Sequence, residues 1–199
     1  MKKLWLLAMG VVAVWSVVIA AGSFVNAQTN GTPVPFSADW VHYAAGEPVE
    51  RGKYYVNPEA TRLEQPVLMA EGADPVIITT ISDFKKMIFY VLDASDRTYY
   101  TGRIQALQAG WDDFGKFGVP CPSYAQATRI GSDTLKGRAT EKWSCEIPHQ
   151  TEIAWFDTRL QRTIRIEYEG SDEHFEMINI KEGLQPESLF VPPPGYKRR

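Results

Sequence analysis

Short runs of alternating apolar and polar residues, separated by turn residues, fill most of the chain after residue 35. The clearest run is TIRIEYE at 163–169, where Ile164, Ile166 and Tyr168 alternate with charged residues. A period of two places the apolar side chains on the buried face of a strand and the polar ones on a solvated face. Strand candidates at regular short spacing, with turn residues between them, predict an antiparallel sheet or barrel.

Two segments depart from simple alternation. KMIFYVL at 86–92 is apolar on both faces, so the strand that it forms needs cover on both sides. HFEMINI at 174–180 begins with Phe175 and Met177 on one face and then changes parity at Ile178. A β-bulge near Met177–Ile178 would explain this change.

The spacing of apolar residues also changes at 104–117, where Ile104, Leu107 and Trp111 recur near a helical period. We expect this segment to be the main helix of the domain, ending at the glycines that follow. About ten strands and one helix predict a mainly β fold with minor α content. Since a sheet of that size tends to curl, we expect it to be strongly curved and antiparallel, with the helix lying across its concave side as a partial lid.

The first 27 residues have the pattern of a secretory signal. Lys2 and Lys3 precede an almost unbroken apolar run at 4–21, and Val25 and Ala27 suit the −3 and −1 positions of a signal-peptidase site. The alternative is an uncleaved anchor in the inner membrane, because a run of this length is just enough to span a bilayer. We therefore expect a periplasmic or secreted protein, with membrane contact only through an uncleaved N-terminus.

The rest of the chain is expected to contain a short linker and one domain. Residues 28–35 are polar and rich in turn residues, and residues 36–199 carry the strand pattern without an internal repeat. Without the two leader lysines, the 21 basic residues fall to 19 against 24 acidic ones. This negative balance argues against a nucleic-acid partner, and the closing KRR is expected to be a frayed, solvated terminus.

Cys121 and Cys145 are the only two cysteines. A zinc site would need about four ligands at close spacing, but no CxxC is present and no histidine lies between the two residues. A catalytic thiolate would need a base nearby. Exported proteins meet oxidising conditions, in which paired thiols become disulfides. We therefore expect a Cys121–Cys145 disulfide.

The sequence carries no recognisable catalytic signature. It contains no G-x-S-x-G, H-E-x-x-H, phosphate-loop or dinucleotide-binding motif. His149 lies three residues from Glu152, and His174 lies two residues from Glu176. One histidine with one or two acidic residues supplies too few ligands for a typical metal site. We expect a protein that is not an enzyme and has no catalytic residue, cofactor or metal.

The order of several motifs resembles a known superfamily. GKYYVNPEATRLE comes first, followed by an aspartate before an aromatic strand and a turn into RTYY. ATRIGSDTLKGRATEKW, WFDTRLQRTIRIEYEG and a closing F-x-x-P-x-G pattern continue the series. Over about residues 36–197 the chain is similar to the LolA/LolB-like superfamily, and most similar to its DUF4412 branch of exported bacterial proteins. The resemblance implies an open antiparallel half-barrel whose concave side is capped by one or more helices.

In the lipoprotein carriers of this superfamily, the hollow of the half-barrel holds acyl chains. A carrier has an arginine just before the proline that follows its second strand, whereas this chain has Val56-Asn57-Pro58 there. This chain also has fewer residues available for capping helices. Both departures argue against lipoprotein transport itself, so no carrier residue is transferred to this chain.

Two functions fit the expected fold. The first is a non-enzymatic binding module that holds a lipid or an acylated protein in an apolar hollow. The second is an envelope structural, interaction or sensor module whose hollow is filled by its own side chains and whose partner is an envelope protein. The residues expected to line the hollow are Trp40, Phe89, Leu107, Trp111, Trp155 and Ile166. We expect the four outside the helix to be largely buried and to face the concave side or the helix over it.

Overall fold

The computed structural model describes residues 34–67, 74–104, 118–122 and 125–199. These residues form one twelve-stranded sheet and a short 3-10 turn, η1. In sheet order the strands are β12 (Lys197–Arg198), β6 (Thr98–Arg103), β5 (Ile88–Asp93), β4 (Val76–Asp83), β3 (Ala60–Val67), β2 (Glu47–Asn57), β1 (Phe36–Ala44), β11 (His174–Glu182), β10 (Arg162–Tyr168), β9 (Gln150–Asp157), β8 (Arg138–Ile147) and β7 (Gln126–Leu135).

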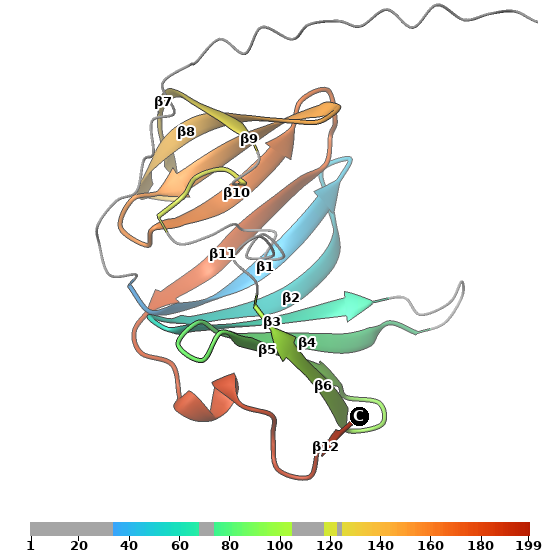
Figure 1. The fold of residues 1–199 in the computed structure, drawn as a ribbon. Helices are drawn as coiled ribbons and strands as arrows, with labels where there is room; N and C mark the ends of the chain where they lie inside the picture. The colour runs from blue at the N-terminus through green and yellow to red at the C-terminus, as the bar shows by residue number, and fades with distance from the viewer. Residues whose placement is uncertain (1–33, 68–73, 105–117, 123–124) are drawn as a thin grey trace, which may run out of the picture.

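The sheet curves strongly into an open half-barrel, with β1 and β11 near its middle and β7 and β12 at its edges (Figure 1). Neighbouring strands are antiparallel except for β12, which runs parallel to β6. The expected fold class, mainly β with a strongly curved antiparallel sheet, is therefore confirmed. About ten strands were expected, and the described residues contain twelve.

The strand that sequence reasoning missed is β12, at the C-terminus. The closing KRR was expected to be frayed and solvated. Its side chains on β12 are exposed, but Lys197 pairs with Thr98 and Arg198 pairs with Tyr99, so the expected fraying was wrong. Without this pairing, β6 would present a full row of unpaired backbone groups at the edge of the sheet. Two residues of β12 cover part of that edge.

The two faces of the sheet follow from the pairing, because directly opposed residues on neighbouring strands share a face. We call the face that carries Phe36, Ala38 and Trp40 the inner face, since it lines the concave side, and the other the outer face. The largest buried hydrophobic cluster lies about β1, β2, β3, β10 and β11. Its members are Phe36, Ala38, Trp40, Tyr54, Val56, Leu63, Leu160, Ile164 and Met177.

The C-terminal segment covers the outer face of β4 and β5. The turn η1 (Glu187–Phe190) lies outside the curve of the sheet (Figure 1), and Phe190 packs with Ile81 and Leu92 in one buried cluster. Alternate residues of β5 thus face this segment and the concave side, which explains why KMIFYVL is apolar on both faces. From the sequence alone, a helix was expected to cover the second apolar face of this strand.

The expected helix at 104–117 lies, apart from Ile104, outside the described residues. Among the residues that the structure does describe, η1 is the only helical turn and no α-helix occurs on the concave side. In that same part of the chain, no helix is long and apolar enough to cross a membrane. The proposed signal or anchor at 1–27, with its apolar run at 4–21, falls outside the described residues, as does most of the linker at 28–35.

The strand that contains HFEMINI has a bulge, as expected, but it lies at Asn179–Ile180 rather than at Met177–Ile178. The register between β1 and β11 shifts between Ser37 and Asp39, whose partners are Lys181 and Ile178. Three steps along β11 therefore match two along β1, and the extra residue makes a bulge. Asn179, within this bulge, adopts a left-handed backbone with φ of 53°.

The expected disulfide is confirmed. Cys121 and Cys145 are bonded, with their Cα atoms 5.5 Å apart. Both residues are buried in a second hydrophobic cluster, which also contains Trp143 and Phe156. The hydroxyl of Thr163 donates to the carbonyl oxygen of Pro120, so the segment that carries Cys121 is also fastened to β10.

Candidate functional site

Apolar side chains line the inner face from β3 to β6. Pairing puts Leu63 opposite Thr80, Thr80 opposite Val91, and Val91 opposite Tyr100, all on the same face as Trp40. The apolar residues of these four strands that lie on this face and remain half-buried or exposed form what we call the inner patch, and the polar residues Gln65, Thr80 and Asp93 lie among them. Its members are Val67, Val76, Ile78, Phe89, Val91 and Tyr100.

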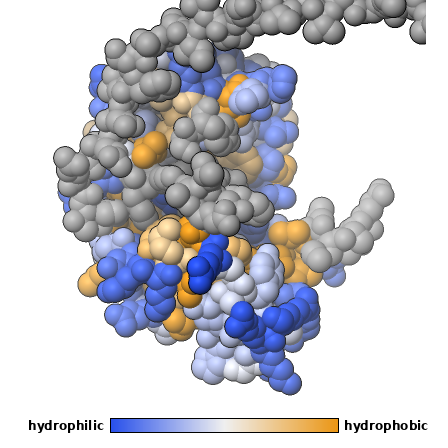
Figure 2. All heavy atoms as spheres, viewed as in Figure 1, coloured by the Kyte–Doolittle hydropathy of each residue, from blue (hydrophilic) through white to orange (hydrophobic). Residues whose placement is uncertain are grey.

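Hydrophobic residues are visible within the curve of the sheet in Figure 2, between more hydrophilic residues on its outside. Tyr100 is 51% exposed, and its ring meets that of Phe89 edge-on, with the ring centres 6.2 Å apart. Gly102 makes room for Phe89, since a Cβ at this glycine would lie 2.6 Å from the Cζ atom of the ring. The inner patch is therefore an aromatic and aliphatic surface with defined packing.

The middle of the inner face is filled by the protein itself. Trp40 is only 5% exposed, and its indole N–H donates to the carbonyl oxygen of Glu64 across β2. Gly52 leaves space for the indole to pass. Ile166, also buried, faces the same side through its pairing with Phe175. Both residues have the expected burial and face, but they leave little apolar area for a ligand.

Trp155 is buried but lies on the other face from Ile166. It pairs with Arg165, whereas its neighbour Ala154 pairs with Ile166. The Trp155 indole lies between Lys142 and Arg165, whose cationic groups are 4.5 and 5.4 Å from its ring centre. A register shift between Thr163 and Arg165 sets this pairing and could not be read from the strand pattern. The expectation that Trp155 faces the concave side with Ile166 was therefore wrong.

The remaining predicted site residues have different outcomes. Phe89 lies on the inner face as expected, but it is half-buried rather than buried. Leu107 and Trp111 lie outside the described residues, so their predicted role in the hollow stays a prediction.

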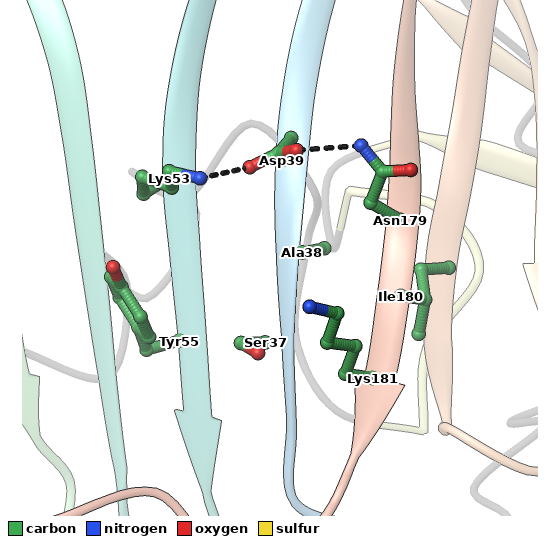
Figure 3. A pocket seen from close by; sticks show the side chains of 8 residues that line it. All are labelled: Ser37, Ala38, Asp39, Lys53, Tyr55, Asn179, Ile180 and Lys181. Atoms are coloured by element: carbon green, nitrogen blue, oxygen red, sulfur yellow. Dashed lines mark hydrogen bonds and ion pairs between the residues drawn. The ribbon is translucent and has the colours of Figure 1, made fainter.

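A polar depression interrupts the outer face where β2, β1 and β11 meet (Figure 3). Asp39 lies at one end of it, between Lys53 and Asn179. One carboxylate oxygen accepts from the Lys53 ammonium, and the other accepts from the Asn179 amide at 2.7 Å. These bonds, that of Asn179 foremost, lower the pKa of Asp39 below its usual 3.8.

Because of this lowered pKa, Asp39 should stabilise the fold only when ionised. The contribution is complete above its unfolded pKa of 3.8 and is lost as pH falls through the lower folded pKa. Asp39→Asn should cost less than about 1 kcal/mol near neutral pH, since Lys53 is largely exposed. Urea unfolding from about pH 7 down to about pH 2.5 should show the two proteins converging in acid, and a constant difference would contradict this.

The histidines of the β1 and β11 strands are packed against aromatic rings. His42 stacks on Phe175 and His174 stacks on Tyr43, with ring centres 4.3 and 4.5 Å apart. Burial, helped by the nearby charge of Arg165, lowers the pKa of His174. Within the described ranges, no group of three His, Cys, Asp or Glu residues is placed to hold a metal ion.

Comparison with known proteins supports the fold. No protein-family model matches the chain, and no curated protein matches it. Among solved structures, PNGF-II is 12% identical over 83% of this chain with a TM-score of 0.54, and the match spans 30% of the PNGF-II chain. An uncharacterised conserved protein from Thermus thermophilus has the same identity, TM-score and coverage of this chain, and the match spans 91% of its own chain.

A domain of a putative outer membrane lipoprotein-sorting protein from Vibrio parahaemolyticus is also similar, with 9% identity and a TM-score of 0.35 over 82% of this chain and 92% of that one. At these identities the comparisons concern the fold alone. The expected link to the DUF4412 branch is not tested by them and stays a prediction.

Sequence reasoning missed several residues that shape both surfaces. Gly52 and Gly102 read as ordinary strand glycines, although a glycine inside a strand can signal the close approach of a neighbouring side chain. Tyr100 belongs to a short strand without clear alternation, so its face could be known only from its partner Val91. Asp39 has no distinguishing signal in the sequence, because its bonds to Lys53 and Asn179 reach across three strands.

Proposed function

We propose that the protein is an exported, non-enzymatic binding module that holds a lipid or an acylated protein against the concave side of its sheet. The observation that carries the proposal is the inner patch, whose six apolar side chains remain half-buried or exposed. On the outer face of β4 and β5, by contrast, Phe190 and its neighbours cover Ile81 and Leu92. A contiguous apolar surface on one face is typical of a binding site, unlike apolar residues exposed singly.

The inner patch rather than the Trp40 region is the proposed contact for the acyl chain. Trp40 and Ile166 are already buried by the protein's own side chains, whereas Phe89, Val91 and Tyr100 keep accessible area. Each CH₂ group removed from water contributes about 0.8 kcal/mol. An acyl chain of about 14 carbons therefore has enough hydrophobic free energy to bind without a polar anchor, even when only part of it is covered.

Export is supported by two independent features. The N-terminal pattern at 1–27 is that of a secretory signal. The Cys121–Cys145 bond suits an oxidising compartment, because cytosolic thiols are kept reduced. We therefore place the protein in the periplasm or outside the cell, with an uncleaved N-terminal anchor as the alternative.

A charge placed on the inner patch tests the proposal. Tyr100→Glu should weaken binding of a fluorescent fatty acid about tenfold, because the acyl chain would have to desolvate a carboxylate. Ile77→Glu is the matched control: Ile77 is 45% exposed, similar to Tyr100 at 51%, but lies on the outer face of β4. The dissociation constant is measured by fluorescence titration, and circular dichroism checks that each variant is folded.

The control should bind the probe as the unmodified protein does. Equal weakening by both variants would show that the probe does not use the inner patch. Failure of the unmodified protein to bind any acyl probe would contradict the lipid proposal. The second candidate would then stand, an interaction module with an envelope protein partner, which the filled cluster about Trp40 favours.

A further inference from the structure

The depression on the outer face has the form of a second site, unrelated to the inner patch. It has a volume of about 420 Å³ and lies on the opposite side of the sheet from Phe36 and Trp40. Most of its lining is polar. The lining residues are Ser37, Ala38, Asp39, Lys53, Tyr55, Asn179, Ile180 and Lys181.

The order of small and long side chains on three strands creates this hollow. Ser37 on β1 is directly opposed by Tyr55 on β2 and by Lys181 on β11. A small floor residue between two long neighbours leaves a slot, and Figure 3 shows Ser37 between the Tyr55 ring and the Lys181 side chain. A regular sheet face would instead carry side chains of similar height side by side.

The bulge in β11 closes one end of the slot. Asn179, in its left-handed conformation, turns its amide toward Asp39 and fixes that carboxylate. Bulges commonly re-aim side chains next to functional sites. Asn179 and Ile180 also line a separate, smaller hollow of about 160 Å³.

The charges in the depression leave one cation available to a ligand. Lys53 and Asp39 neutralise each other, and both oxygens of Asp39 already accept hydrogen bonds. Within the described part of the chain, the side chain of Lys181 makes no hydrogen bond or ion pair, although its charge is near enough to act on Asp39. The hydroxyl of Ser37, on the floor of the slot, is a donor next to this cation.

We propose that the outer depression binds an anionic group, a phosphate or a carboxylate, between the Lys181 ammonium and the hydroxyl of Ser37. The two groups are donors on adjacent, directly paired strands beside one slot, and hydrogen bonds from a charged donor to an anion are stronger than neutral ones. A cation would meet Lys53 and Lys181 with no carboxylate oxygen left to accept it. The anion is supplied either by a free solute or by the headgroup of an anionic lipid.

The test uses the mature, disulfide-bonded protein and inorganic phosphate as the first probe. Amide NMR shifts are followed during a phosphate titration at constant ionic strength, with acetate as a second anion. We expect saturable shifts at Ser37, Tyr55 and Lys181. Lys181→Gln should weaken binding about tenfold, because it removes the charged donor. Lys197→Gln, which removes an exposed lysine on β12, is the matched control and should bind as the unmodified protein does.

A second arm identifies the source of the anion. Co-sedimentation with phosphatidylglycerol vesicles that is lost in Lys181→Gln would support a lipid headgroup, and saturable phosphate shifts without vesicle binding would support a free solute. No saturable shift with either anion, or equal affinities for Lys181→Gln and the unmodified protein, would overturn the proposal. The fatty-acid titration of the inner patch should be unchanged in Lys181→Gln, so the two proposals can fail separately.

Discussion

Gly52→Ala should lower the free energy of unfolding by about 3 kcal/mol, the upper range for overpacking a filled site. An added Cβ at this position would overlap the carbonyl oxygen of Glu64 and the indole nitrogen of Trp40, and would lie 2.5 Å from the Cε2 atom of that indole. Neither neighbour can give way easily. Trp40 is packed in the main cluster, and the Glu64 carbonyl belongs to β3 and accepts the indole N–H.

Urea unfolding followed by tryptophan fluorescence measures this loss. Gly131→Ala is the matched control, because Gly131 also lies inside a strand, yet a Cβ there would meet nothing within 4 Å. The control should change the free energy of unfolding by no more than about 0.5 kcal/mol. Equal destabilisation of the two variants would mean that the loss comes from the glycine backbone rather than from the contact with Trp40.

A double-mutant cycle separates the indole from the backbone clash. In a Trp40→Ala background, Gly52→Ala should cost about 1 kcal/mol less than in the unmodified protein, because the indole is no longer in the way. Part of the cost should persist, since the Glu64 carbonyl remains in place. Full additivity of the two changes would show that Trp40 does not occupy the space above Gly52.

The existence of the strands could be predicted because it depends on local signals, whereas their order in the sheet, with β1 beside β11, could not. Alternation in TIRIEYE and turn residues at short spacing are properties of the segments themselves. The parity change in HFEMINI also predicted a bulge, since a slip of one residue must occur somewhere along the strand. The disulfide followed from an even count of cysteines in an exported chain.

The assignment of side chains to a face was less accessible, because it depends on register between strands far apart in sequence. Trp155 and Ile166 were expected on one side, but the bulge between Thr163 and Arg165 puts them on opposite faces. The cover on the outer face of β5 comes from Phe190, about a hundred residues further along the chain. No local pattern links these segments, so the inner patch and the outer depression required the structure.

Loss of the disulfide should lower the free energy of unfolding by about 3.5 kcal/mol, the chain-entropy value for a loop of this length. Cys121 and Cys145 are 24 residues apart, and the loop between them contains all of β7. Without the bond, the unfolded chain gains the conformations that the closed loop excludes. The double variant Cys121→Ala and Cys145→Ala is preferred to serine, because both positions are buried among apolar side chains.

Reductant provides the internal control. Dithiothreitol should bring the unmodified protein down to the stability of the double variant and leave the variant itself unchanged. Thiol labelling of the native protein before reduction should find no reactive cysteine, and two labelled thiols per chain would show that the bond is not formed.

Hydrogen exchange then locates the effect. The bond joins the segment at 118–122 to β8, and β8 is the only partner of β7 among the described strands. Amides of β7 and β8 should therefore exchange faster in the double variant, while those of β4 and β5, at the other end of the sheet, should change only as far as global stability falls. Equal loss of protection throughout the sheet would indicate that the bond acts on the unfolded chain alone, whereas a larger loss at β7 and β8 would show that it also holds the edge of the half-barrel in place.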